Sequence, residues 1–184
     1  MLRALLHRSI DAMEKKYAYD ADYLRQVLAV SPWTFLKFGL VTTLGRGKRA
    51  PAEATVAAGL VGTLAEDCGP CTQIAVDIAA EHGVSPFVVR AILAADEAAM
   101  GEVAALAWRF ARASLAREMT TCDPLREEIV RRWGPGGLVD IALSLATSRM
   151  YPTLKYAMGH GKTCSRVLVA GEPAAFVRAL DLAA

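Results

Sequence analysis

The sequence predicts an all-α protein, and three features of the chain predict it. Of its 184 residues, 54% are hydrophobic and 22% are charged, which is the balance of a chain that buries a core. β-Branched residues are scattered and show no sustained alternation, so strand signals are weak. Helix starts and stops recur, with Pro or Ser-Pro at the starts and Gly at the ends. We expect about eight helices in a single domain that covers residues 1–184.

In the first half, each helix is delimited by its own start and stop residues. The N-terminal segment has the spacing of an amphipathic helix. Ser31 and Pro32 are suited to the N-cap and first position of the next helix, which Gly45 ends. Pro51 opens a helix in the same way, and Gly83 ends the one after it. The helices expected after the first cover residues 33–44, 51–65, 72–81 and 87–95.

In the second half, proline and glycine again set the boundaries. Asp123 and Pro124 form a cap, and the Gly-Pro-Gly-Gly run at 134–137 is a firm break. Pro152 is expected to kink or interrupt the helix that contains it. Pro173 is expected to open a short last helix. The expected helices cover residues 97–119, 125–133, 138–158 and 172–184.

The charge and hydropathy of the chain exclude some function classes. The formal net charge is only +2, which argues against a nucleic-acid partner or an acidic membrane surface. No apolar run reaches the roughly 18 residues of a membrane span, and the N-terminal apolar stretch is too short for a signal peptide. We therefore expect a cytoplasmic protein whose four cysteines meet a reducing environment.

Cys68 and Cys71, with Gly-Pro between them, are the most informative feature of the chain. If Cys71 lies in the first turn of a helix and Cys68 at its cap, the two sulfur atoms come within bonding reach. A helix N-terminus carries partial positive charge, which favours a thiolate, the form that attacks peroxides and disulfides. The sequence therefore predicts a redox-active dithiol, within a chemistry-bearing core at roughly residues 51–95.

Together with their surroundings, these residues resemble the alkylhydroperoxidase D-like and carboxymuconolactone decarboxylase-like family over roughly residues 32–164. The likeness rests on an alanine-rich helix that runs into the dithiol, a following helix that ends at His82-Gly83-Val84-Ser85, and a closing helix at 138–159. The resemblance implies an all-α fold, a homo-oligomer, and peroxidase activity in which Cys71 attacks, Cys68 resolves and an external dithiol restores both.

The chain departs from the family pattern at two places. Peroxidase members carry a glutamate one helix before the dithiol and a histidine one turn after the second cysteine. The corresponding positions here hold Val56 and Ala75. The proton relay that the resemblance would supply is therefore absent from its usual positions.

Other residues could assist the dithiol. Glu66 and Asp67 directly precede Cys68, and Glu66 is our candidate acid-base residue. Each of these two carboxylates is also a plausible solvated cap. His82 lies about three turns beyond Cys71, too far along the helix to touch its sulfur, and is also suited to a C-terminal turn.

Zinc is an alternative occupant of the cysteines. His160 and Cys164 could join the dithiol in a site of three thiolates and one imidazole. Zinc ligands usually sit on short knuckles, whereas here one pair opens a helix and the other follows a long one. We therefore expect no metal and no cofactor. Cys122 is expected to be a small buried residue.

Three functions follow from these patterns. The leading hypothesis is a thiol–disulfide oxidoreductase that uses Cys68 and Cys71, reduces a small hydroperoxide or disulfide and is recharged by an external dithiol. The alternative is an oligomeric protein in which the reversible disulfide is a redox sensor or a structural element, without turnover. Decarboxylation of a muconolactone is a third reading, which only the family name suggests.

Overall fold

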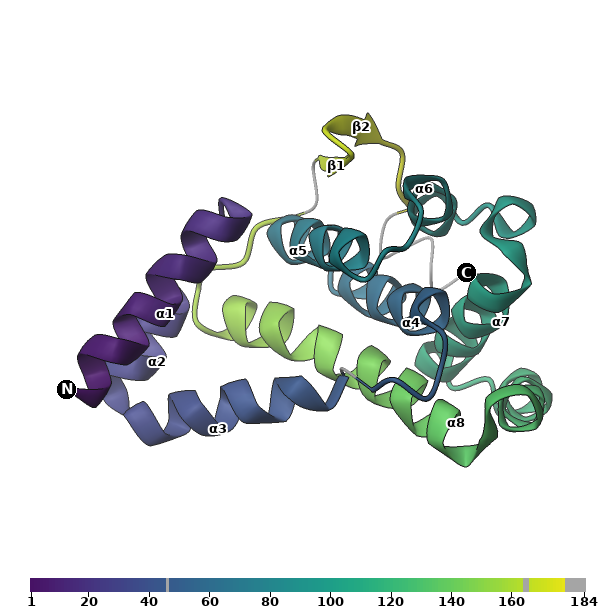
Figure 1. The fold of residues 1–184 in the computed structure, drawn as a ribbon, viewed down its shortest axis with the longest axis horizontal. Coiled ribbons are helices and arrows are strands. Elements are labelled where there is room, and N and C mark those ends of the chain that lie inside the picture. The colour runs from purple at the N-terminus through teal and green to yellow at the C-terminus, as the bar shows by residue number, and fades with distance from the viewer. Residues whose placement is uncertain (46, 164–165, 178–184) are drawn as a thin grey trace.

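The all-α prediction is confirmed by the computed structural model, which describes residues 1–45, 47–163 and 166–177 (Figure 1). The described residues form eight α-helices, one short 3₁₀ turn and a two-stranded hairpin. The helices are α1 (Leu2–Tyr17), α2 (Asp22–Val30), α3 (Pro32–Thr42), α4 (Ala52–Ala65), α5 (Gly69–Glu81), α6 (Pro86–Ala94), α7 (Glu97–Ala116) and α8 (Met119–Ala157). The 3₁₀ turn is η1 (Thr43–Gly45), and the strands are β1 (Val167–Val169) and β2 (Glu172–Ala174).

Helix α4 is the centre of the main core and packs against α5, α6, α7 and α8. Ten of its 14 residues are buried, because alanine and glycine let the neighbouring helices approach closely. At Gly62 a Cβ atom would lie 2.9 Å from the backbone oxygen of Leu145 in α8. The Ser144 hydroxyl of α8 also donates a hydrogen bond to the carbonyl of Thr55 over 2.7 Å. Helix α8 is thereby fixed across α4.

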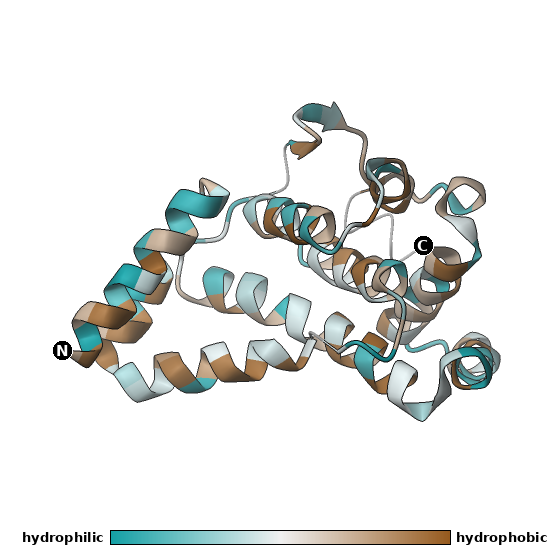
Figure 2. Cartoon of the chain, viewed as in Figure 1, coloured by the Kyte–Doolittle hydropathy of each residue, from teal (hydrophilic) through white to brown (hydrophobic). Residues whose placement is uncertain are grey.

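Helices α1, α2 and α3 form a separate group beside α8 (Figure 1). Tyr23 and Leu28 of α2 are buried there with Ile10 of α1, and Tyr151 of α8 packs against the group. Helix α3 itself has no buried residue, and Trp33 and Leu40 are 67% and 71% exposed. Figure 2 shows hydrophobic residues along α3 at the edge of the molecule. A homo-oligomer would bury the exposed hydrophobic residues of α3 between subunits, and this oligomer stays a prediction.

Several predicted boundaries are confirmed. The backbone N–H of Thr34 donates to the Ser31 hydroxyl over 3.2 Å, and Pro32 is the first residue of α3. The break near residue 134 is also present, since Gly134 has a φ of 69° within α8. Helix α5 begins between the two cysteines, as the dithiol pattern requires.

Three expectations are wrong in the described residues. Helix α2 was not expected at all, and α8 begins at Met119 rather than after Pro124. Pro152 neither breaks nor ends α8, whose only interior residue with a non-helical backbone is Gly134. Proline removes one backbone hydrogen bond from a helix, but Pro152 is buried, and its neighbours Tyr151 and Leu154 pack against the cluster of α1, α2 and α3, which offsets that loss.

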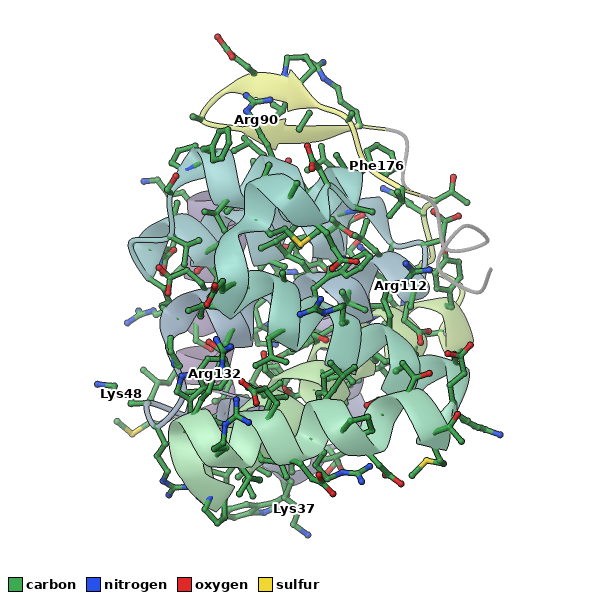
Figure 3. All side chains as sticks on the ribbon, turned by 90° about the vertical axis from the view of Figure 1, so that its right-hand side faces the viewer. Lys37, Lys48, Arg90, Arg112, Arg132 and Phe176 are labelled. Atoms are coloured by element: carbon green, nitrogen blue, oxygen red, sulfur yellow. The ribbon has the colours of Figure 1, made fainter. Side chains whose placement is uncertain are left out.

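The segment expected to open a last helix instead forms a β-hairpin. Ala170 and Gly171 both have positive φ, 52° and 81°, as a tight two-residue hairpin turn requires. Val167 pairs with Ala174 and Val169 with Glu172. The Arg90 guanidinium of α6 donates to the carbonyls of Val169 and Pro173 and so fixes the hairpin (Figure 3). Residues 178–184 of the expected helix lie outside the described residues.

None of the helices in the described part of the chain combines the length and the apolar character that a membrane crossing needs.

Candidate functional site

The cysteine pair lies at the N-terminus of α5, as predicted. Cys68 is the N-cap, and Gly69 and Pro70 lead into a first turn that contains Cys71. The backbone N–H and the hydroxyl of Thr72 both donate to the carbonyl of Cys68, over 2.9 and 3.0 Å, which fixes the cap. Both cysteines are free thiols and both are buried, with exposed fractions of 0% for Cys68 and 6% for Cys71.

The two thiols are linked by a hydrogen bond and titrate as a pair. Hydrogen bonds from the Cys71 thiol and from the Cys71 backbone N–H lower the pKa of Cys68 to about 7, although burial acts against this shift. The same pairing and burial raise the pKa of Cys71. Ionisation of the pair near neutral pH is therefore favoured at Cys68 over Cys71.

Two tyrosines and a lysine lie on the other side of the pair. The Tyr19 hydroxyl is 3.9 Å from Cys71 Sγ and donates to the Tyr23 hydroxyl over 3.1 Å. Lys155 Nζ lies 4.3 Å from the centre of the Tyr19 ring and 5.6 Å from that of Tyr23. Burial raises the pKa of both tyrosines, which keeps them neutral. In the cluster of Cys68, Cys71, Tyr19, Tyr23 and Lys155, the positive charge comes from the Lys155 ammonium.

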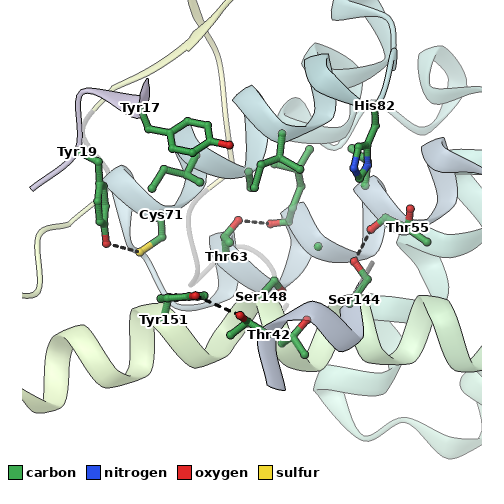
Figure 4. A pocket seen from close by; sticks show the side chains of 18 of the residues that line it. Tyr17, Tyr19, Thr42, Thr55, Thr63, Cys71, His82, Ser144, Ser148 and Tyr151 are labelled. Atoms are coloured by element: carbon green, nitrogen blue, oxygen red, sulfur yellow. Dashed lines mark hydrogen bonds between the residues drawn. The ribbon is translucent and has the colours of Figure 1, made fainter. Parts of the chain in front are cut away.

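A cavity of about 300 Å³ opens beside Cys71, between the α1–α2 region, α4, α5 and α8 (Figure 4). Apolar atoms make up most of its surface. Four tyrosines and several serines and threonines also line it, and no Asp, Glu, Lys or Arg is among its described lining residues. The hydroxyl-bearing residues are Tyr17, Tyr19, Tyr23, Thr42, Thr55, Thr63, Ser144, Thr147, Ser148 and Tyr151. The cavity is suited to an uncharged, mostly apolar molecule.

Val56 and Ala75, the two positions where the family resemblance would place a proton relay, both line this cavity together with Cys71. Both positions therefore face the cavity beside Cys71, where a proton relay would be expected, but they hold apolar side chains. His82 lines the same cavity from the C-terminal end of α5, apart from Cys71 (Figure 4).

The predicted acid-base residue Glu66 is occupied by other partners. Its carboxylate accepts hydrogen bonds from Arg149 Nε over 2.6 Å and from the Thr153 hydroxyl over 3.3 Å. Asp67 adopts a left-handed backbone with a φ of 47°, and its charge acts to raise the pKa of Cys68. A role of Glu66 in proton transfer stays a prediction.

The residues of the zinc alternative are only partly described. Nε2 of His160 lies 2.9 Å from Nε2 of Gln26, so this imidazole already has a partner. Cys164 lies outside the described residues. Within the described ranges, the one cluster of potential metal ligands is Glu14, Asp20 and Asp22, which does not include the dithiol.

Cys122 is buried far along the chain from the dithiol, as expected for a packed cysteine. Its sulfur lies 3.3 Å from the Ser114 hydroxyl and accepts a hydrogen bond from Arg126 over 3.5 Å.

Sequence analysis did not identify Lys155, Tyr19, Tyr23 or Tyr151 as parts of the site. Lys155 belongs to a helix expected to be disrupted at Pro152, and the tyrosines come from the first 23 residues and from α8. No local pattern marks these residues, because they come from distant parts of the chain and meet only through packing. No family model, curated protein or solved structure matches this chain.

Proposed function

We propose that the protein is a cytoplasmic thiol–disulfide oxidoreductase whose Cys68–Cys71 dithiol reduces a small organic disulfide or hydroperoxide. The observation that carries the proposal is the division of labour between the sulfurs. Cys71 lines the cavity, whereas Cys68 lies behind it and ionises more readily. The Cys71 sulfur can react with a substrate in the cavity. Cys68 can accept the Cys71 proton and then attack the Cys71 sulfur to resolve the intermediate.

With a disulfide substrate, the Cys71 sulfur attacks one substrate sulfur while its proton passes to Cys68. The substrate S–S bond breaks, one substrate sulfur leaves as a thiolate, and Cys71 forms a mixed disulfide. After losing its proton, Cys68 attacks the Cys71 sulfur and releases the second substrate thiolate. The substrate gains two electrons, and the protein is left with a Cys68–Cys71 disulfide.

With a hydroperoxide, the Cys71 sulfur attacks the terminal oxygen, and the O–O bond breaks. Cys71 becomes a sulfenic acid, and the alkoxide takes up a proton to leave as an alcohol. The Cys68 thiolate then attacks the Cys71 sulfur, and the hydroxide leaves as water after protonation. An external dithiol reduces the resulting disulfide in both cases and is itself oxidised to a disulfide.

The cavity lining supports an uncharged substrate. An anion entering it would lose its hydration shell, and no Lys or Arg is among its described lining residues. This observation argues against decarboxylation of an acidic lactone, the third reading of the sequence.

Single substitutions test the proposal. The wild-type protein, supplied with dihydrolipoamide, is expected to reduce cumene hydroperoxide or a small aromatic disulfide, and Cys71→Ser is expected to abolish turnover. Cys68→Ser is expected to stop turnover and to accumulate a mixed disulfide or a sulfenic acid on Cys71, which mass spectrometry detects. Cys122→Ala is the matched control and should keep wild-type rates. Full turnover by both serine variants would rule out the proposal.

A redox switch without turnover is the second candidate, and the burial of both sulfurs favours it. It predicts that Cys68 and Cys71 form a disulfide reversibly in glutathione buffers while steady-state rates stay at background. Measuring the redox equilibrium and the turnover on the same sample separates the two functions.

A further inference from the structure

We propose that Lys155 is a positioning residue of the dithiol, whose buried ammonium holds the negative charge of the Cys68–Cys71 pair beside the cavity. The inference deepens the proposed function and rests on it. Lys155 comes from α8 and brings a charged group to the dithiol cluster. Val56 and Ala75, which line the cavity beside Cys71, bring no polar side chain.

The burial of Lys155 is the first observation. The residue is 1% exposed, and its Nζ has no hydrogen-bond partner among the described residues. A lysine side chain is long and flexible and normally brings its ammonium to water. An ammonium held away from water, with no carboxylate hydrogen-bonded to it, is costly, so a compensating negative charge is expected close by.

The surroundings of Lys155 identify that charge. Its ammonium lies over the faces of the Tyr19 and Tyr23 rings, at 4.3 and 5.6 Å from the ring centres, and interacts electrostatically with the Asp20 carboxylate without a hydrogen bond to it. Ring faces attract a cation but do not neutralise it. The hydroxyl of Tyr19 lies 3.9 Å from Cys71 Sγ. Lys155, Tyr19 and the dithiol therefore form one buried cluster.

The other charged and titratable groups around the dithiol do not stabilise its negative charge. Asp67, in the loop before α5, opposes ionisation of Cys68, and burial keeps Tyr19 and Tyr23 uncharged by raising the pKa of each. Asp20 faces Lys155 and has its own exposed ion pair with Lys162. Among the described residues, Lys155 is the cation whose charge acts most to lower the pKa of both Cys68 and Cys71. Its effect therefore does not depend on which sulfur carries the charge.

A redox consequence follows. A cation beside the dithiol stabilises the reduced, partly ionised form but not the neutral disulfide. Lys155 should therefore make the pair easier to reduce, so that it is readily recharged by an external dithiol. Removing the charge should favour the disulfide.

The test replaces the ammonium and keeps the stem, with Lys155→Met in the full chain. Alkylation of Cys68 and Cys71 by iodoacetamide is followed from pH 5 to 10 by peptide mass spectrometry, so that the other two cysteines do not contribute. We expect the pH midpoint to rise and the rate at pH 7 to fall about tenfold, the change for one pKa unit. The equilibrium constant with glutathione should shift about tenfold towards the disulfide, which equals about 30 mV for two electrons.

Three further measurements separate this role from a structural one. At pH 5, where the dithiol is protonated and offers the ammonium no counter-charge, Lys155→Met should unfold at a higher denaturant concentration than the reduced wild type. Lys155→Arg should keep the wild-type alkylation midpoint. Lys162→Met, which removes a cation from an exposed ion pair with Asp20, is the matched control and should change neither profile nor equilibrium.

The outcomes are decisive. A folded Lys155→Met protein with an unchanged midpoint and an unchanged glutathione equilibrium would overturn the proposal. If that variant does not fold, Lys155→Gln carries the same expectations, and the failure of both neutral variants to fold would also contradict it. If the profiles shift as expected but the wild type turns over no disulfide or hydroperoxide, the role of Lys155 stands and the proposed oxidoreductase function falls.

Discussion

The Glu66 carboxylate accepts a hydrogen bond from Arg149 Nε over 2.6 Å, and this ion pair ties the end of α4 to α8. The side chain of Glu66 is 17% exposed and that of Arg149 is 43% exposed, so solvent screens the pair only in part. Glu66 is also the residue that the sequence suggests as an acid-base partner of the dithiol. The hydrogen bond with Arg149 gives this carboxylate a structural role, which is to hold the end of α4 against α8.

This contact leads to the first prediction. Glu66→Gln should lower the free energy of unfolding by about 0.5–1 kcal/mol, because a partly exposed charged hydrogen bond is lost. Turnover at pH 7 should stay within about threefold of wild type, since the carboxylate is occupied by Arg149 rather than by a thiol. Chemical denaturation and steady-state kinetics measure the two effects. Arg149→Met, which breaks the same pair from the other side, should give a similar stability loss.

A large fall in turnover for Glu66→Gln, together with normal turnover for Arg149→Met, would instead assign Glu66 to proton transfer.

The second prediction concerns the pH dependence of stability in the reduced protein. The pKa of Cys68 is lowered to about 7 in the folded state, below the ordinary value of about 8.5 for a free thiol in an unfolded chain. Between these two values the unfolded state binds more protons at this site, so its contribution to stability rises with pH. The contribution is fully present above the unfolded value and is lost as the pH falls through about 7.

At still higher pH, Cys71 reverses the trend. Its pKa is raised in the folded state, so the unfolded state ionises first and stability falls again. Urea midpoints of the wild type, measured under reducing conditions at pH 6, 7, 8, 9 and 10 and compared with those of Cys68→Ser, isolate the effect. A difference between the two proteins that stays constant over this range would contradict the lowered pKa of Cys68.

The third prediction concerns the cavity. Ala75 lies one turn after Cys71 and lines the cavity, so Ala75→Leu should fill part of its volume of about 300 Å³. The turnover of a bulky aromatic disulfide should fall by about tenfold or more, because the substrate no longer reaches Cys71 in a reactive position. Alkylation by iodoacetamide, a much smaller reagent, should change by less than about threefold, since the ionisation of the pair is not touched.

Ala80→Leu is the matched control for Ala75→Leu. It makes the same change on an exposed face of α5, outside the cavity, and should leave the aromatic disulfide rate unaltered. Equal losses for the two variants would point to a general effect on α5 rather than to a blocked cavity.

The elements that the sequence predicts well are those set by local chemistry. The Ser31 cap, the start of α4 after Pro51 and the break at Gly134 are all in place. In each case, one residue type decides the backbone conformation by itself, through a side-chain acceptor, a fixed φ or access to positive φ.

The elements that the sequence predicts poorly depend on distant partners. Pro152 stays within α8 because buried neighbours from the N-terminal helices hold that turn. The hairpin at β1 and β2 exists with the help of Gln73, whose side-chain amide donates to and accepts from the backbone of Leu168 over 3.0 and 2.8 Å. Neither contact leaves a periodic signal in the sequence.

By itself, the sequence determined a helical chain and the placement of two cysteines across the start of one helix, because cap geometry and a three-residue spacing are local properties. Only the tertiary structure decided what surrounds them. Residues from the first 23 positions and from the end of α8 meet around the sulfurs, and the ammonium of Lys155 lies among them. A pKa depends on charges, rings and burial within a few ångströms, and such neighbours are brought together by packing rather than by sequence separation.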